Sequence, residues 1–230
     1  PNQRCLNMHH GINITDKFMD IIEKKMVDPS TDDNWQLLDP HTKEPRDTVS
    51  ATELWQRILE MRMQTGEPYI HYIDTSNKEL PKHLKDKGLK IHQSNLCSEI
   101  ILPTAEDGTA VCCLSSLNLE HYDEWKQEKN FIKDVLEMLD NVLEHFINTA
   151  PDSVSRAVYS AKRERSVGVG ALGFHAYLQR NGIPFESALA KSKNMHLFDY
   201  IRSELDKANK QLLEEKLLDY QSQENHDDQN

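Results

Sequence analysis

The 230-residue sequence has few cysteines, no long apolar run and a deficit of positive charge. Its four cysteines are too few for a disulfide framework, and none are spaced as C-x-x-C for a zinc site. The lack of both a run of about eighteen apolar residues and a signal-peptide pattern argues against a membrane span or secretion. A formal net charge of −11 argues against general binding to nucleic-acid backbones. We therefore expect a cytoplasmic chain that binds neither membrane nor nucleic acid.

The composition predicts a modest hydrophobic core. Apolar residues make up 37% of the chain, and the mean hydropathy is −0.71. Such a core fits a piece that buries its faces against other segments, and the opening Pro1 is consistent with an excerpt or a processed product. We expect residues 1–220 to form one partial domain, and residues 221–230, which are polar, to be a disordered tail.

Hydrophobic periodicity predicts strands that alternate with helices, which favours an α/β fold. Capping residues and apolar stripes place the helices, and shorter apolar runs place the extended segments. We expect helices over 15–26, 50–65, 130–149, 167–180 and 187–218, a strand over 69–73, extended segments over 92–102 and 109–116, and connections over 28–49 and 78–90.

The most informative residues form S-N-L-C-S-E-I at 94–100 and A-V-C-C-L-S at 110–115. In an extended segment, Asn95, Cys97 and Glu99 would point the same way and present an amide, a thiol and a carboxylate in one row. A thiol that donates a hydrogen atom, a carboxylate that takes a proton and an amide that holds a hydroxyl suit chemistry on a polyol.

Plainer interpretations of these residues stay open. A cysteine in a short apolar run is usually a small buried hydrophobe, and the neighbouring Asn and Glu can simply cap a turn. A Cys–His nucleophile pair is disfavoured, because an extended segment puts His92 and Cys97 on opposite faces. Metal binding is also disfavoured, because no histidine stands at ligand spacing from Cys97 or Cys112.

Together with flanking motifs, these residues resemble the barrel core of the large, catalytic subunit of class I ribonucleotide reductase. The resemblance extends upstream to I-T-D-K-F-M at 14–19 and T-G-E-P-Y at 65–69, and downstream to R-S-V-G-V-G at 165–170. It therefore covers most of the chain, from about residue 12 to about residue 215. It implies part of a ten-stranded α/β barrel, with Cys97 on a finger loop at its centre.

The resemblance also implies a role for each candidate site residue. Cys97 matches the cysteine that becomes a thiyl radical and abstracts the 3′ hydrogen of the ribose, and Glu99 matches the carboxylate that takes the 3′-hydroxyl proton. Asn95 matches the amide that orients the sugar. Cys112 matches one of two thiols that reduce the 2′ position and end as a disulfide. The adjacent Cys113 departs from the family pattern, and strand alternation predicts a buried spectator on the opposite face.

Several partners are implied in the same way. They are a ribonucleoside diphosphate substrate, a small metal-containing subunit that generates the radical, thioredoxin or glutaredoxin as reductant, and a second copy of the full large subunit. No cofactor is expected on this chain, and ATP and dNTP effectors are expected to bind elsewhere in the full subunit. The second reducing thiol and the tyrosines that pass the radical belong to segments of the family outside this match, so the chain alone is expected to be inactive.

Two rival interpretations concern function. The first is the cobalamin-dependent class of the same superfamily, whose finger loop usually reads differently from S-N-L-C-S-E-I. The second is a non-enzymatic remnant that only assembles with other fragments.

A further motif, G-x-G-x-x-G at 168–173, suggests a dinucleotide site. The residues before it do not read as a buried strand, and no acidic residue follows a second strand about twenty positions on. We therefore interpret these glycines as sites of close helix packing.

Overall fold

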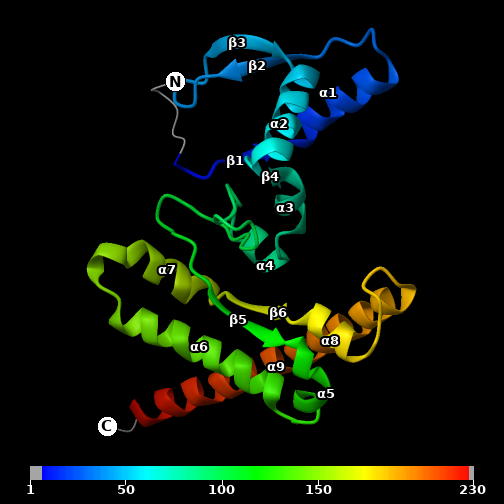
Figure 1. The fold of residues 1–230 in the computed structure, drawn as a ribbon. Helices are drawn as coiled ribbons and strands as arrows, with labels where there is room; N and C mark the ends of the chain where they lie inside the picture. Colours follow the sequence, from blue (N-terminus) through cyan, green and yellow to red (C-terminus); the bar gives the residue numbers. More distant parts are fainter. Residues whose placement is uncertain (1–6, 228–230) are drawn as a thin grey trace. The chain divides into compact units, whose positions relative to one another are not determined.

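The computed structural model describes residues 7–227, with side chains as far as residue 218. The chain divides into two compact units, Pro1–Glu106 and Asp107–Asn230, and each is described by itself (Figure 1). Both units mix helices with strands, as the sequence predicted, and the strands of the described residues form three two-stranded sheets. The single partial domain expected over 1–220 stays a prediction.

The first unit is built on a parallel pair of strands joined by a helical crossover. Strand β1 (Gly11–Ile14) pairs with β4 (Tyr69–Tyr72), and the register places Gly11 opposite Tyr69. The crossover consists of α1 (Asp16–Val27), β2 (Asn34–Leu38), β3 (Pro45–Ser50) and α2 (Ala51–Thr65). A parallel pair needs such a crossover, which a tight hairpin cannot supply.

Local capping fixes both helices of this crossover. The Thr15 hydroxyl accepts a hydrogen bond from Phe18 N at the start of α1, and the Ser50 hydroxyl accepts one from Glu53 N at the start of α2. Gly66 ends α2 in the left-handed region, at φ 78°. These boundaries confirm the predicted helices.

The connection expected over 28–49 is wrong, because β2 and β3 form an antiparallel hairpin there. The edge of Trp35 on β2 packs against Phe18 of α1, with ring centroids 5.0 Å apart. The core of this region also contains Ile14, Ile22 and Ala51. The hairpin is thus held by a contact with a distant helix, which local sequence does not reveal.

The exposed connection expected over 78–90 is also wrong in part. After β4 the chain forms α3 (Ile73–Glu79) and α4 (Lys82–Lys85). Leu80, Leu84 and Ile91 are buried together in a small core of their own. The charged residues of this stretch are therefore interspersed with apolar residues that are buried, so the stretch is only partly exposed.

The second unit repeats the parallel arrangement. Strand β5 (Cys113–Asn118) pairs with β6 (Val167–Leu172), with Cys113 opposite Val167. The elements between these strands are η1 (Leu119–His121), α5 (Tyr122–Trp125), α6 (Phe131–Thr149), η2 (Asp152–Val154) and α7 (Ser155–Glu164). The chain then continues through α8 (Phe174–Arg180) and α9 (Ala188–Asp227).

Helix α6 supplies much of the core of this unit. It contacts both β5 and β6, and α9 packs along it (Figure 1). Leu143 of α6 is fully buried, as are Leu119 and Leu178 in the neighbouring cluster around α8 and α9. The predicted apolar stripe of this helix is therefore confirmed as packing.

Three further predictions in this unit need correction. The helix expected over 167–180 begins as strand β6, and α8 starts only after Gly173, whose φ is 76°. Gly168 and Gly170 therefore lie within a paired strand, so helix packing does not explain them. Helix α9 continues through Asp227, so the disordered tail expected from residue 221 is helical as far as 227. Residues 228–230 lie outside the described part.

Among the residues that the structure describes, no helix combines the length and the apolar character needed to cross a membrane.

Candidate functional site

The candidate site of the first unit lies on the loop formed by residues 91–104, here called the thiol loop. Its base is closed by Thr104, whose amide donates to the Lys90 carbonyl at 3.1 Å and whose hydroxyl lies 3.2 Å from His92 Nδ1. The Asn77 side chain holds Ile91, donating to its carbonyl and accepting from its amide, both at 2.9 Å. Two independent anchors therefore fix the ends of the loop.

The tip of the thiol loop is a tight turn from Asn95 to Ile100. Asn95 N donates to the Ile100 carbonyl at 3.1 Å, and Ile100 N donates back to Asn95 Oδ1 at 3.0 Å. Ser98 N donates to the Asn95 carbonyl, and Ser98 adopts a left-handed φ of 68°. The amide of Asn95 also donates to Glu99 Oε1 at 2.8 Å, while Cys97 is exposed within the turn.

This geometry corrects one expectation. Asn95, Cys97 and Glu99 do not form the row of an extended strand, because the Asn95 side chain satisfies the backbone of a turn instead. The structure still brings Asn95 and Glu99 into direct contact, with Cys97 between them in the chain. Chemically, the turn offers an accessible thiol beside a carboxylate whose orientation is fixed by an amide.

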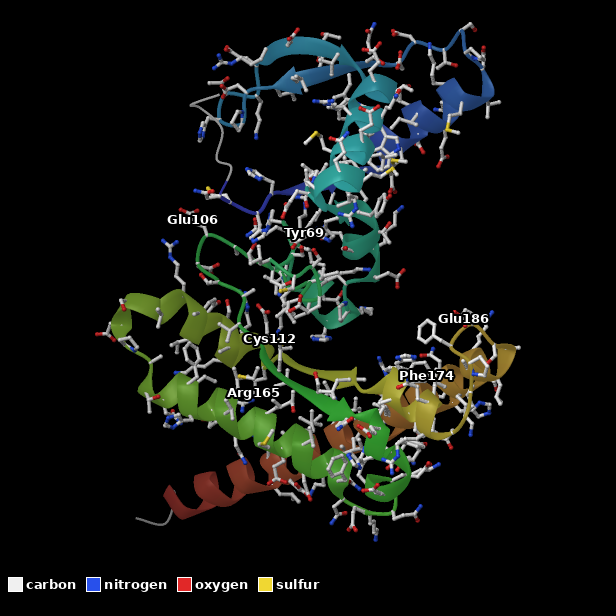
Figure 2. The ribbon with its side chains drawn as sticks, viewed as in Figure 1. Tyr69, Glu106, Cys112, Arg165, Phe174 and Glu186 are labelled. Atoms are coloured by element: carbon white, nitrogen blue, oxygen red, sulfur yellow. The ribbon has the colours of Figure 1, made fainter. Side chains whose placement is uncertain are left out.

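The second unit carries the two adjacent thiols at the entry to β5, where Figure 2 labels Cys112. Cys113 packs into the apolar cluster that contains Leu143 of α6. The Cys112 sulfur lies on the other face, where a Cβ placed on Gly168 of β6 would be 3.5 Å away. The predicted opposite orientation of the two thiols is confirmed, and the space that a side chain at Gly168 would need is occupied by Leu114, with the Cys112 sulfur next to it.

Burial keeps both of these thiols protonated at neutral pH. Burial, and after it the neighbouring Cys113, raises the pKa of the Cys112 thiol, and burial likewise raises the pKa of Cys113. A thiolate is the reactive nucleophile, so a raised pKa disfavours nucleophilic chemistry here. It suits a thiol that gives up its hydrogen to a reaction partner.

An ionic cluster of Arg165, Asp140, Glu144 and Lys216 fixes the start of β6. Arg165 ends α7 with a left-handed φ of 46°, at the place labelled in Figure 2. Its guanidinium donates to Asp140 Oδ1 at 2.7 and 2.9 Å and to Glu144 Oε2 at 2.6 Å. Lys216 of α9 contacts the other oxygen of Asp140. The cluster therefore ties β6, the neighbour of Cys112, to α6 and α9.

Opposing effects act on the carboxylates of this cluster. Burial alone would raise the pKa of Asp140, but hydrogen bonds from Lys216 and Arg165 outweigh it and hold that pKa below its ordinary value. The hydrogen bond from Arg165 likewise lowers the pKa of Glu144. Both groups are therefore charged near neutral pH.

The predicted site residues are divided between the two units. Asn95, Cys97 and Glu99 belong to the first and Cys112 to the second, so their roles in one reaction stay predictions. Cys5 lies outside the described residues. Within the part of the chain that the structure describes, no three His, Cys, Asp or Glu side chains are grouped so that they could hold a metal ion. From the sequence, no role was assigned to the loop anchor Asn77, which lies eight residues after the T-G-E-P-Y motif.

Parallel strand pairs joined by helical crossovers define the α/β class of fold. The structure of the Actinobacillus ureae class Id ribonucleotide reductase alpha subunit superimposes with a TM-score of 0.75 at 33% sequence identity, over 90% of this chain and 36% of that one. The family model for the ribonucleotide reductase barrel domain matches residues 2–227. The chain therefore belongs to the ribonucleotide reductase family, and its fold is part of that barrel.

Curated relatives agree with this family. The ribonucleoside-diphosphate reductase large subunit of Invertebrate iridescent virus 3 is 42% identical over 258 aligned residues, covering 92% of this chain and 41% of that protein. A Frog virus 3 (isolate Goorha) protein assigned to the same subunit is 50% identical over 218 residues, covering 94% of this chain and 37% of that protein. The chain spans about two fifths of the length of these relatives.

Proposed function

We propose that this chain is the central part of the large subunit of a class I ribonucleoside-diphosphate reductase, an oxidoreductase that makes deoxyribonucleotides. The observation that carries the proposal is the turn of the thiol loop. Cys97 lies between Asn95 and Glu99 in the sequence of this turn, and the side chains of Asn95 and Glu99 are hydrogen-bonded to each other. The amide, thiol and carboxylate of the family motif thus lie on one hydrogen-bonded turn.

In the proposed reaction, a radical reaches the Cys97 sulfur from a metal-containing small subunit. The thiyl radical takes the 3′ hydrogen of the ribose, so a C–H bond breaks and an S–H bond forms. Glu99 accepts the proton of the 3′ hydroxyl as a general base. Asn95 is the amide that orients the sugar, and its hydrogen bond to Glu99 also holds the carboxylate in place. Thiol and activated ribose hydrogens are bound with similar strength, so the transfer can be reversed at the end of the cycle.

The reduction itself is assigned to Cys112 and a second thiol from another segment. The 2′ hydroxyl leaves as water, the 2′ carbon gains a hydrogen, and the two thiols supply two electrons and become a disulfide. The raised pKa of Cys112 supports this role, because the group that enters the reaction is then the thiol. Cys113 is a spectator that packs against α6.

The proposal includes the partners of this chemistry. Thioredoxin or glutaredoxin returns the disulfide to two thiols, the full large subunit is a homodimer, and ATP and dNTP effectors bind in other parts of it. The cytoplasm is the proposed compartment, because thiols stay reduced there. We propose that turnover also needs a second reducing thiol and a radical path supplied by other segments of the full large subunit.

The test uses Cys97→Ser and Cys112→Ser in a complex completed with the large-subunit segments found in the relatives. Cys97→Ser abolishes turnover and keeps substrate binding. Cys112→Ser blocks deoxyribonucleotide formation, yet still releases label from substrate tritiated at the 3′ position, because hydrogen abstraction precedes reduction.

Cys113→Ser is the matched control, since it removes the adjacent thiol from the opposite face. It keeps most of the turnover. The assignment fails if Cys97→Ser remains active, or if Cys113→Ser rather than Cys112→Ser blocks reduction. Activity that needs adenosylcobalamin and no small subunit would place the chain in the other class.

A further inference from the structure

A chain of polar contacts joins the first sheet to the base of the thiol loop. Asn13 of β1 donates through Nδ2 to the His92 carbonyl at 2.7 Å, and Asn13 Oδ1 lies 3.1 Å from Nδ1 of His71 on β4. His71 Nε2 lies 2.7 Å from the Ser76 hydroxyl, which is also 3.2 Å from the Tyr72 carbonyl. The contacts thus run without a break from α3 through both strands to the loop.

The chemistry of these groups fixes the position of one proton. A carbonyl oxygen only accepts, so the Asn13 amide must turn its NH₂ toward His92 and its oxygen toward His71. That oxygen can bind only a donor, so His71 carries a proton on Nδ1. In the neutral ring Nε2 is then an acceptor, so the Ser76 hydroxyl donates its one proton to Nε2 at 2.7 Å in preference to the Tyr72 carbonyl at 3.2 Å.

The contacts lie beside the turn that carries the proposed chemistry. Asn13, His71 and Asn95 all line one cavity of about 230 Å³ in the first unit. Asn77 and Thr104 already hold the loop at Ile91 and at Lys90 and His92. The hydrogen bond from Asn13 to the His92 carbonyl joins the thiol loop to the β1–β4 sheet, three residues before the turn begins at Asn95.

We propose that His71 and Asn13 are positioning residues, which hold the thiol loop against the β1–β4 sheet so that the Asn95–Ile100 turn keeps its geometry. His71 orients the Asn13 amide, and Asn13 holds the His92 carbonyl. In the part of the chain that the structure describes, the side-chain hydrogen bonds of Asn13 and His71 go to each other, to His92 and to Ser76, and none goes to Asn95, Cys97 or Glu99. The inference rests on the proposed function only in taking this loop as the reactive one.

The direct test is the tautomer of His71, read from long-range ¹H–¹⁵N correlations of the ring at about pH 8, above the ordinary histidine range. The wild-type ring shows the Nδ1–H form. Asn13→Ala removes the acceptor, and the ring reverts to Nε2–H. Ser76→Ala is the control and keeps Nδ1–H. An Nε2–H ring in the wild type, or no change in Asn13→Ala, overturns the proposal.

The second test compares two conservative replacements of His71. The amide nitrogen of Asn matches imidazole Nδ1 in position, whereas that of Gln matches Nε2. His71→Asn therefore keeps the bond to Asn13, and His71→Gln loses it. Hydrogen exchange at the Ser98 and Ile100 amides rises roughly five- to tenfold in His71→Gln and stays within about twofold in His71→Asn, as expected for one net hydrogen bond.

Equal exchange in the two variants overturns the positioning role, whatever their thermal stability. In the completed enzyme, His71→Gln lowers kcat with little change in KM, and His71→Asn restores kcat. The proposed function and the positioning role of His71 and Asn13 can be refuted independently of each other. Turnover that survives Cys97→Ser refutes the proposed function and leaves the tautomer and exchange results standing, whereas the wrong tautomer refutes only the positioning role.

Discussion

The ionic cluster at the start of β6 gives a quantitative prediction for Asp140→Asn. This change keeps the shape of the side chain and removes its charge. Asp140 is only 6% exposed and receives hydrogen bonds from Arg165 and Lys216, so the variant leaves two cations facing a neutral amide. We expect the second unit to lose stability and the first to be unaffected.

The magnitude follows from burial and screening. Removing one partner of a fully buried ion pair costs about 3–5 kcal/mol, and a hydrogen bond to a charged group contributes about 1.5–3 kcal/mol. The side chains of Arg165 and Lys216 are 31% and 41% exposed, so solvent screens part of the loss. We expect about 2 kcal/mol, which corresponds to a fall of about 1 M in the urea midpoint.

The assay is urea unfolding followed through Trp125, which is buried in the second unit, in a background where Trp35 and Trp55 are replaced by Phe. Glu144→Gln is the matched control: its side chain is 44% exposed, and we expect about 0.5 kcal/mol. A loss below about 0.5 kcal/mol for Asp140→Asn would refute the argument that burial makes this cluster strong.

The same variant has a distinct pH dependence. Because the folded pKa of Asp140 is depressed, its contribution is fully present above the unfolded value of about 3.9 and is lost as pH falls through the folded value. The wild-type protein therefore loses part of its advantage over Asp140→Asn as the pH is lowered below about 4. A stability difference that is constant across this range would contradict the assignment.

Three further predictions concern other parts of the molecule. Leu143→Ala removes a fully buried side chain from α6 and lowers the free energy of unfolding in urea by about 3 kcal/mol. A loss of stability under about 1 kcal/mol would mean that neighbouring side chains relax to fill the cavity. Ser50→Ala removes the cap of α2, costs about 1 kcal/mol, and lets the pKa of Asp33, which hydrogen bonds from Ser50 and Thr52 hold at about 2, rise in a carboxyl NMR titration. Gly168→Ala places a Cβ against the Leu114 side chain of β5 and leaves the Cys112 sulfur at an ordinary contact distance of 3.5 Å, so it costs about 1–3 kcal/mol in urea unfolding; a variant as stable as the wild type would show that Leu114 moves aside freely.

Local signals in the sequence were sufficient wherever a helix begins or ends by its own hydrogen bonds. The helix boundaries at Thr15, Ser50 and Gly66 were predicted correctly, because a cap needs only residues within one turn of the helix. The apolar stripe of α6 was also predictable, because its period is a property of the helix alone.

Features that depend on distant contacts were not predictable in this way. Residues 167–172 form a strand because β5 pairs with them, and the sequence V-G-V-G-A-L by itself does not reveal that partner. The turn that carries Cys97 was missed for a local reason instead: the Asn95 side chain accepts a hydrogen bond from the Ile100 backbone amide, whereas alternation of side chains predicted a strand. The sequence motif thus identified the residues of the site, but side-chain alternation predicted an extended segment where the structure has a turn.

The left-handed backbone of Ser98 limits how the sequence of this loop can vary. Left-handed φ costs a residue with a Cβ roughly 1–2 kcal/mol, and the cost is greatest for β-branched side chains. The residues that can replace Ser98 without added backbone strain are therefore glycine, asparagine and similarly permissive residues. Handedness of the main chain, rather than any chemistry of the serine hydroxyl, sets that restriction.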